Sequence, residues 1–206
     1  MLGYVTASGR GEGDRVLSAL AERLRTEGVR IVGAVQRNLD RPVGAPCDME
    51  LCVLSGAGVW RISQRLGPHA RGCRLDPQGL EQAVGAVAAE LAGQPAVDLV
   101  IVNKFGKQEA DGRGFRPVIA AALLADLPVL TAVNAKNLPA FLAFAEGLAE
   151  PVAPEPEALR QWCLPRIAAG KRAGLGLTAR VGEPWRDKRP APGRALPSGA
   201  SLACRG

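Results

Sequence analysis

The chain has 206 residues, of which 47% are apolar and 4% aromatic, and its formal net charge is +6. This length and composition allow one sizeable buried core. The chain lacks the run of about 18 apolar residues that a membrane-spanning helix needs, and its start does not resemble a secretory signal, so we expect a cytoplasmic protein without a membrane span.

The positive charge belongs to the C-terminal part of the chain. Residues 151–206 hold ten Lys/Arg and four Asp/Glu, whereas residues 1–150 hold 16 of each kind. We therefore expect a neutral globular part with a basic appendage, and the scarcity of aromatic residues disfavours nucleic-acid binding. The five cysteines form no C-x-x-C pair, which disfavours a disulfide framework or a zinc knuckle and fits a reducing compartment.

Apolar strands alternate with amphipathic helices over the first 150 residues. In chain order, the pattern predicts a strand at 2–7, a helix at 12–27, a strand at 29–36, a hairpin within 49–64, a helix at 77–91, a strand at 97–104, a helix at 116–125, a strand at 127–134 and a helix at 138–148. The segment V-D-L-V-I-V-N-K is apolar on both faces, as a central parallel strand is. The sequence thus predicts an α/β three-layer sandwich, with a mostly parallel sheet, a β-hairpin excursion and helices on both faces.

From residue 151 the pattern changes. Residues 155–169 predict an amphipathic helix that Pro165 should kink, and beyond Gly170 apolar residues are too sparse to fold alone. We therefore divide the chain into an α/β domain (1–150), a helical appendage (151–171) and a basic, Pro/Gly-rich tail (172–206) that we expect to be disordered.

The glycine-rich stretch S-G-R-G-E-G-D-R connects the first strand to the first helix. Its glycines let backbone N–H groups converge, and the helix N-terminus adds a partial positive charge, so an anion site remains possible. A phosphate-binding loop carries Lys followed by Ser or Thr where this chain has Asp14 and Arg15. At ~4 Å and an effective dielectric of about 20, each charge–charge term is roughly 4 kcal/mol, so Asp14 weighs against a bound phosphate. The candidate residues here are Ser8, Gly9, Arg10, Gly11, Gly13, Asp14 and Arg15.

Carboxamides follow three of the four predicted parallel strands. They are Gln36 with Asn38, Asn103 beside Lys104, and Asn134. Ligands of open parallel sheets bind beyond the carboxyl ends of the strands, and a ring of amides suits a polar or anionic ligand better than Mg²⁺. The alternative is that each amide only satisfies loose backbone groups.

Three smaller features of the sequence each allow more than one interpretation. The loop K-F-G-K-Q-E-A-D-G-R-G-F-R, with Lys104 and Lys107, fits either a lid that closes on an anion or a solvated loop. Cys47 and Cys73 flank the hairpin, where they would ligate a soft metal or be incidental thiols. The single histidine, His69, lies in an expected surface loop, which disfavours a catalytic role.

Two families resemble this chain. S-G-R-G-E-G-D-R and V-D-L-V-I-V-N-K-F-G-K-Q-E are similar to the Walker A and Walker B segments of the thermophilic-type nucleoside triphosphatases, a P-loop family, which implies a P-loop-NTPase-like sheet. On that resemblance, Asn103 replaces the metal-binding Asp and Lys104 the catalytic Glu, while Gly106, Lys107 and Glu109 keep the pattern. V-N-K-F-G-K-Q-E-A-x-G-R-G-F-R and V-N-A-x-N-L-P-A-F resemble more closely a bacterial domain-of-unknown-function family, often encoded beside molybdate-transport genes.

We therefore expect a degenerate P-loop-like protein that binds a small oxyanion, such as molybdate or tungstate, or a nucleotide, without hydrolysis and in the service of molybdenum handling. Two alternatives remain. One is an active NTPase in which Arg10, Arg15 or Lys104 replaces the missing lysine. The other is an interaction module that docks to a protein partner through its basic tail.

Overall fold

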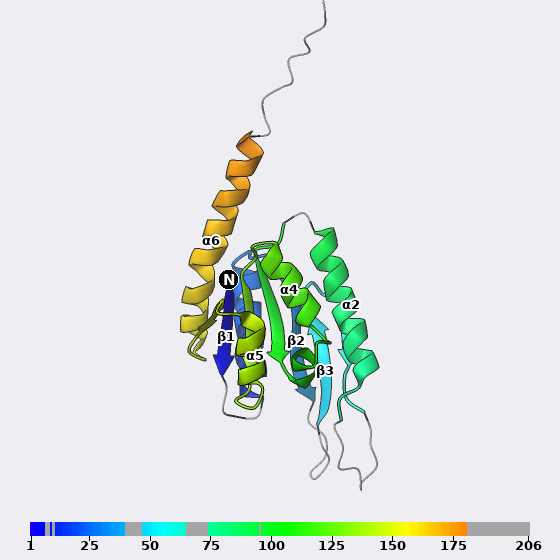
Figure 1. The fold of residues 1–206 in the computed structure, drawn as a ribbon. Helices are drawn as coiled ribbons and strands as arrows, with labels where there is room; N and C mark the ends of the chain where they lie inside the picture. Colours follow the sequence, from blue (N-terminus) through cyan, green and yellow to red (C-terminus); the bar gives the residue numbers. More distant parts are fainter. Residues whose placement is uncertain (7–8, 10, 40–46, 65–73, 95, 181–206) are drawn as a thin grey trace, which may run out of the picture.

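The computed structural model describes residues 1–6, 9, 11–39, 47–64, 74–94 and 96–180. A seven-stranded sheet with the order β4-β3-β2-β5-β6-β1-β7 forms the middle layer (Figure 1). The strands are β1 (Leu2–Thr6), β2 (Ile31–Leu39), β3 (Asp48–Val53), β4 (Val59–Arg61), β5 (Leu99–Phe105), β6 (Val129–Val133) and β7 (Ala149–Pro151). Neighbouring strands from β2 to β7 in this order pair in parallel, whereas β3 pairs antiparallel with both β2 and β4.

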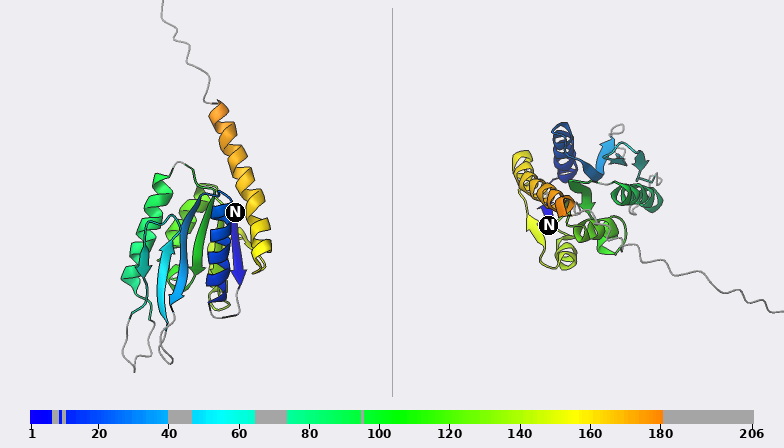
Figure 2. Two further views of the ribbon diagram at one scale, coloured as in Figure 1. Left: turned by 180° about the vertical axis from the view of Figure 1, so that it is seen from behind. Right: turned by 90° about the horizontal axis from the view of Figure 1, so that it is seen from above.

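Helices cover both faces of this sheet (Figure 2). One face carries α1 (Glu12–Thr26) and α6 (Pro156–Arg180), and the other carries α2 (Pro77–Gly93), α4 (Arg116–Leu124) and α5 (Leu138–Ala145). A short helix, α3 (Lys107–Ala110), follows β5 directly. The predicted α/β sandwich, with its mostly parallel sheet and its hairpin, is therefore confirmed.

The sequence pattern explains the two core layers. Leu17, Leu20 and Leu24 recur at helical spacing and are buried, which fixes α1 against the sheet. Helix α2 begins with Pro77 in its first turn, and the preceding Asp76 accepts the Gln78 N–H at 3.0 Å, as an N-cap residue does.

Among the helices of the described ranges, none is long and apolar enough to span a bilayer.

Strand β2 is longer than predicted, and this moves two candidate residues. Its parallel pairing with β5 ends at Ala34↔Val102, but its antiparallel pairing with β3 continues to Leu39↔Asp48. Gln36 and Asn38 therefore lie within a strand that continues past the end of its parallel pairing with β5, rather than at a strand end. The hairpin, a tertiary partner, supplies the hydrogen bonds that extend β2.

The C-terminal segment differs more from the prediction. Strand β7 was not predicted, because its three residues A-E-P carry no periodic pattern and pair only with β1. Helix α6 continues past Pro165 to Arg180, into the segment that the sequence assigns to the tail. Its apolar residues join the core on the α1 face: Leu159, Trp162, Cys163 and Ile167. Residues 181–206 lie outside the described residues.

Candidate functional site

The glycine-rich loop bonds to itself before it enters α1. Gly11 is the N-cap residue and has a left-handed backbone (φ 70°), and a Cβ there would lie 3.3 Å from Nδ2 of Asn38. The Gly9 N–H donates to a carboxylate oxygen of Glu12 at 2.9 Å, and the Glu12 N–H donates to the Gly9 carbonyl at 3.2 Å. Two of the N–H groups that the sequence offered to an anion are thus already paired. Ser8 and Arg10 lie outside the described residues.

Asp14 points from the first turn of α1 toward the sheet. It is only 9% exposed, and each of its carboxylate oxygens accepts a carboxamide N–H. Asn103 of β5 donates to Oδ1 at 2.8 Å, and Asn38 of β2 donates to Oδ2 at 3.0 Å. Asp14 therefore joins α1 to two neighbouring strands at the carboxyl edge of the sheet.

The hydrogen bonds continue from Asp14 to a cation. The backbone N–H of Gln36 donates to Oδ1 of Asn103 at 2.8 Å, which fixes that amide with its NH₂ group toward Asp14. The side chain of Gln36 donates to Oδ1 of Asn38 at 2.7 Å and accepts from Nζ of Lys104 at 2.9 Å. Donation thus runs from the ammonium group through two amides to the carboxylate. We name these five residues the carboxylate–amide network: Asp14, Gln36, Asn38, Asn103 and Lys104.

A cavity of about 1470 Å³ opens beside the network, between α1 and the strands β2 and β3. Its lining gathers several residues proposed from the sequence: Gly11, Asp14, Arg15, Gln36, Cys47 and Lys104. The charged lining residues are Arg15, Arg25, Arg37 and Lys104 against Asp14 and Glu22. Arg37 already pairs with Glu50 at 2.9 Å, whereas Arg15 and Lys104 have no ion-pair partner within the described residues. Arg25 likewise has no ion-pair partner within the described part of the chain, so the cavity offers three cations to an anion.

Three charged lining residues were not proposed from the sequence. They are Glu22, Arg25 and Arg37. A signal for the first two was present, because Arg15, Glu22 and Arg25 recur at helical spacing on the exposed side of α1. No comparable signal marked Arg37, whose place depends on the extension of β2.

Other proposed residues lie elsewhere. Gly13 is buried in the first turn of α1, and Lys107 is exposed at the start of α3. Oδ1 of Asn134 accepts the Asn137 N–H at 2.9 Å, so this amide satisfies a loose backbone group, as the alternative interpretation holds. Cys73 and His69 lie outside the described residues, and within those residues no three metal-ligating side chains come together.

The basic loop after β5 is organised around a buried carboxylate. Glu109 is 4% exposed and accepts the N–H groups of Gly106 at 2.8 Å and Phe115 at 3.0 Å. Burial raises the pKa of Glu109, although these N–H groups and the charge of Lys104 oppose the rise. Arg116, one of the loop's cations, lies 4.7 Å from the centre of the Phe144 ring. The loop is thus held by its own buried carboxylate and by a contact with α5.

Residues 2–162 match the model of a family described as a protein of unknown function, DUF2478. This chain belongs to the DUF2478 family. The match confirms the resemblance to a domain-of-unknown-function family and takes in the strands, α1 to α5 and the first turns of α6.

A curated relative of this DUF2478 chain is named for molybdenum import. Over 149 residues it is 40% identical to a protein named "Molybdenum import ATP-binding protein ModC 2" from Bradyrhizobium diazoefficiens. The match covers 72% of this chain but only 16% of that protein. No solved structure matches the chain.

Proposed function

We propose that this chain is a non-hydrolysing P-loop-like domain that acts in molybdenum import and binds a small oxyanion, such as molybdate or tungstate. The carboxylate–amide network carries the proposal. Phosphoryl transfer needs cationic groups and a metal-binding carboxylate around the phosphates. Here a carboxylate, Asp14, lies at the first turn of α1, and an amide, Asn103, faces it.

The hydrogen bonds of the network support the absence of hydrolysis. Both oxygens of Asp14 are engaged by amide N–H groups, and a phosphate group bound at the N-terminus of α1, directly beside them, would meet repulsion of up to roughly 4 kcal/mol at ~4 Å. The same repulsion requires an oxyanion in the cavity to lie nearer to the cations than to Asp14. Lys104 donates to Gln36, and an ammonium group has no acceptor for the proton of an attacking water. A bound triphosphate would therefore lack the lysine of a phosphate-binding loop and the carboxylate that accepts a proton from the attacking water.

The cavity beside the network supports an oxyanion as the ligand. Lys104 and Arg15 reach it from β5 and from α1, and each has N–H donors left for an anion. An ion held by these cations would not need the N–H groups of Gly9 and Glu12, which are already paired. The restriction to molybdenum rests on the name of the relative. Since most of that protein lies outside the match, its ATP binding is not transferred to this chain.

Calorimetric titration of the full chain with sodium molybdate, tungstate and sulfate tests the proposal. We expect binding of molybdate and tungstate that Lys104→Gln weakens about tenfold or more, because a hydrogen bond to a charged group contributes about 1.5–3 kcal/mol. Lys136→Gln, an exposed lysine outside the cavity, should leave affinity unchanged. Thermal unfolding of both variants checks that the fold is kept. The absence of binding at 1 mM oxyanion, or equal affinity in Lys104→Gln, contradicts the proposal.

A further inference from the structure

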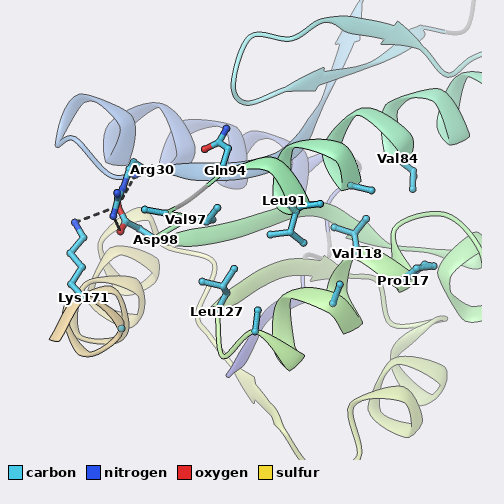
Figure 3. Close-up of a pocket in the computed structure, with 16 residues that line it drawn as sticks. Arg30, Val84, Leu91, Gln94, Val97, Asp98, Pro117, Val118, Leu127 and Lys171 are labelled. Carbon is cyan, nitrogen blue, oxygen red and sulfur yellow. Dashed lines mark hydrogen bonds and ion pairs between the residues drawn. The ribbon is translucent and has the colours of Figure 1, made fainter. Parts of the chain in front are cut away.

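A second cavity, of about 980 Å³, lies at the opposite, amino edge of the sheet (Figure 3). Val97 and Leu127, which precede β5 and β6, line it from the sheet side. Leu91 of α2 and Val118 of α4 line it from the helix layer. Its volume lies within the range of about 300–1,000 Å³ that small-molecule sites occupy.

Small side chains leave this space open between α2 and α4. Four alanines in or directly after the two helices line it: Ala88 and Ala92 of α2, Ala121 of α4, and Ala125, the C-cap residue of α4. A methyl group on each helix cannot close the gap that larger side chains would fill. The part of the cavity between the two helices is therefore lined mostly by apolar side chains.

One end of the cavity carries an uneven set of charges (Figure 3). The Asp98 side chain is 2% exposed and accepts from Arg30 through Nη2 at 2.7 Å, Nε at 3.1 Å and the backbone N–H at 2.9 Å. Nζ of Lys171 in α6 lies 3.3 Å from the same carboxylate. Two cations thus share one anion, which leaves a net charge of about +1 at this end. Arg30 and Lys171 are half exposed, so both keep donors for a further partner.

We propose that this cavity binds a small amphiphile with a single anionic head and an unbranched apolar chain, of which a medium-chain carboxylate is the simplest example. The head contacts Lys171 and Arg30, and the chain lies between α2 and α4. This site is independent of the network at the carboxyl edge and of the oxyanion function proposed for it. A cationic head would be repelled, and a neutral head would leave the excess charge without a partner.

Titration of the full chain with decanoate, decanol and decyltrimethylammonium, all below their micellar concentrations, tests the proposal. We expect decanoate to bind more tightly than decanol and the ammonium compound not to bind. Lys171→Gln should weaken decanoate about tenfold and leave decanol unchanged, and Lys136→Gln serves as the matched control. Lengthening the carboxylate from eight to ten carbons should raise affinity about fourfold per methylene.

A second substitution tests the position of the chain. Ala121 lines the cavity at an exposed position of α4, so Ala121→Trp fills the space without disturbing the buried core. It should abolish decanoate binding, whereas Ala140→Trp, at an exposed position of α5, should not. Thermal unfolding confirms that both variants fold.

Three results would overturn the proposal. They are no decanoate binding, equal binding of decanoate and decanol, and binding that Ala121→Trp leaves intact. If a second copy of the chain occupies the cavity instead, sedimentation will show a dimer that Ala121→Trp dissociates, and decanoate will not bind.

Discussion

Asp14 occupies a position that is unusual for a carboxylate in a strand-to-helix loop of this kind. A negative side chain near a helix N-terminus is favoured by the helix dipole, and here two amides satisfy it as well. Asp14 is therefore an internal anion at the helix N-terminus, held by amides of the strands β2 and β5.

Removing this internal anion should destabilise the fold. Asp14→Ala leaves Nδ2 of the buried Asn103 without an acceptor, and a buried, unpaired donor costs about 1–3 kcal/mol, whereas Asn38 is exposed and can bond to water. We expect the free energy of unfolding, measured in urea, to fall by about 1–3 kcal/mol. Asp111→Ala, which breaks an exposed ion pair, should cost less than about 1 kcal/mol. Equal losses for the two variants would mean that the network does not support the fold.

Asp98 should make stability depend on pH. Burial alone would raise the pKa of Asp98, but hydrogen bonds and charge from Arg30, with Lys171, lower it below 3.8. Because the folded-state pKa lies below the unfolded value, the ionised group stabilises the fold above about pH 3.8, and this contribution is lost as the pH falls through the folded-state pKa.

The variant Asp98→Asn measures this contribution. We expect it to lower the free energy of unfolding by about 2 kcal/mol at pH 7, and the difference from the wild type to shrink as the pH falls from 5 toward 3. Urea titrations at four pH values give the comparison, with Asp111→Asn as an exposed control. A difference that stays constant across these pH values would show that the ion pair does not set the pKa.

At the scale of the elements, the sequence predicted most of the order of strands and helices. Strands β5 and β6 are buried almost throughout, and α1 has a clear apolar stripe, so local pattern and tertiary environment agree. The sequence failed where a distant partner decides the structure. Strand β7 forms because it pairs with β1. Strand β2 continues past its parallel pairing with β5 because it also pairs with β3.

The candidate site was predictable in part for the same reason. The carboxamides Gln36 and Asn103 were identified by their places near strand ends, and they do meet Asp14 and Lys104. Asn134 follows its strand in the same way but only caps a turn. Strand position cannot tell these cases apart, because the outcome depends on whether α1 lies opposite the amide.

Helix α6 packs against the core on the α1 face and is not a separate appendage. The reactivity of Cys163 can therefore be used to measure whether α6 stays packed. The thiol is buried in the core on the α1 face, and burial raises its pKa to about 12. At pH 8 we expect iodoacetamide to leave Cys163 unmodified in the native chain and to modify it in urea, because the thiolate is the reactive form. Mass spectrometry of the Cys163 peptide measures the yield, and half-buried Cys52 serves as the reactive comparison. Native labelling of Cys163 at the rate of Cys52 would show that α6 detaches.

At the scale of the whole molecule, the described interactions end well before the C-terminus. Both buried clusters lie within residues 2–167, and the last ion pair involves Lys171. A chain that ends at residue 180 should therefore unfold within about 2 °C of the full chain. A chain that ends at residue 155 loses α6, exposes the α1 face and should be strongly destabilised. A large loss of stability in the first truncation would show that residues 181–206 support the core.

The sheet separates two chemically different regions. Its carboxyl edge carries the carboxylate–amide network beside a cavity with polar and charged walls, and its amino edge carries an apolar cavity with a charged end. One α/β scaffold can thus carry different chemistry at its two edges. At the carboxyl edge, the side chains of the carboxylate–amide network bind one another.

The most direct test of this account is Mg²⁺-dependent phosphate release from ATP by the full-length chain. Because Asp14 and Asn103 satisfy each other where a triphosphate and its metal would need a lysine and a carboxylate, we predict no release above a buffer control at any ATP concentration up to 5 mM. Release that requires Mg²⁺ and is abolished by Lys104→Gln would contradict the account.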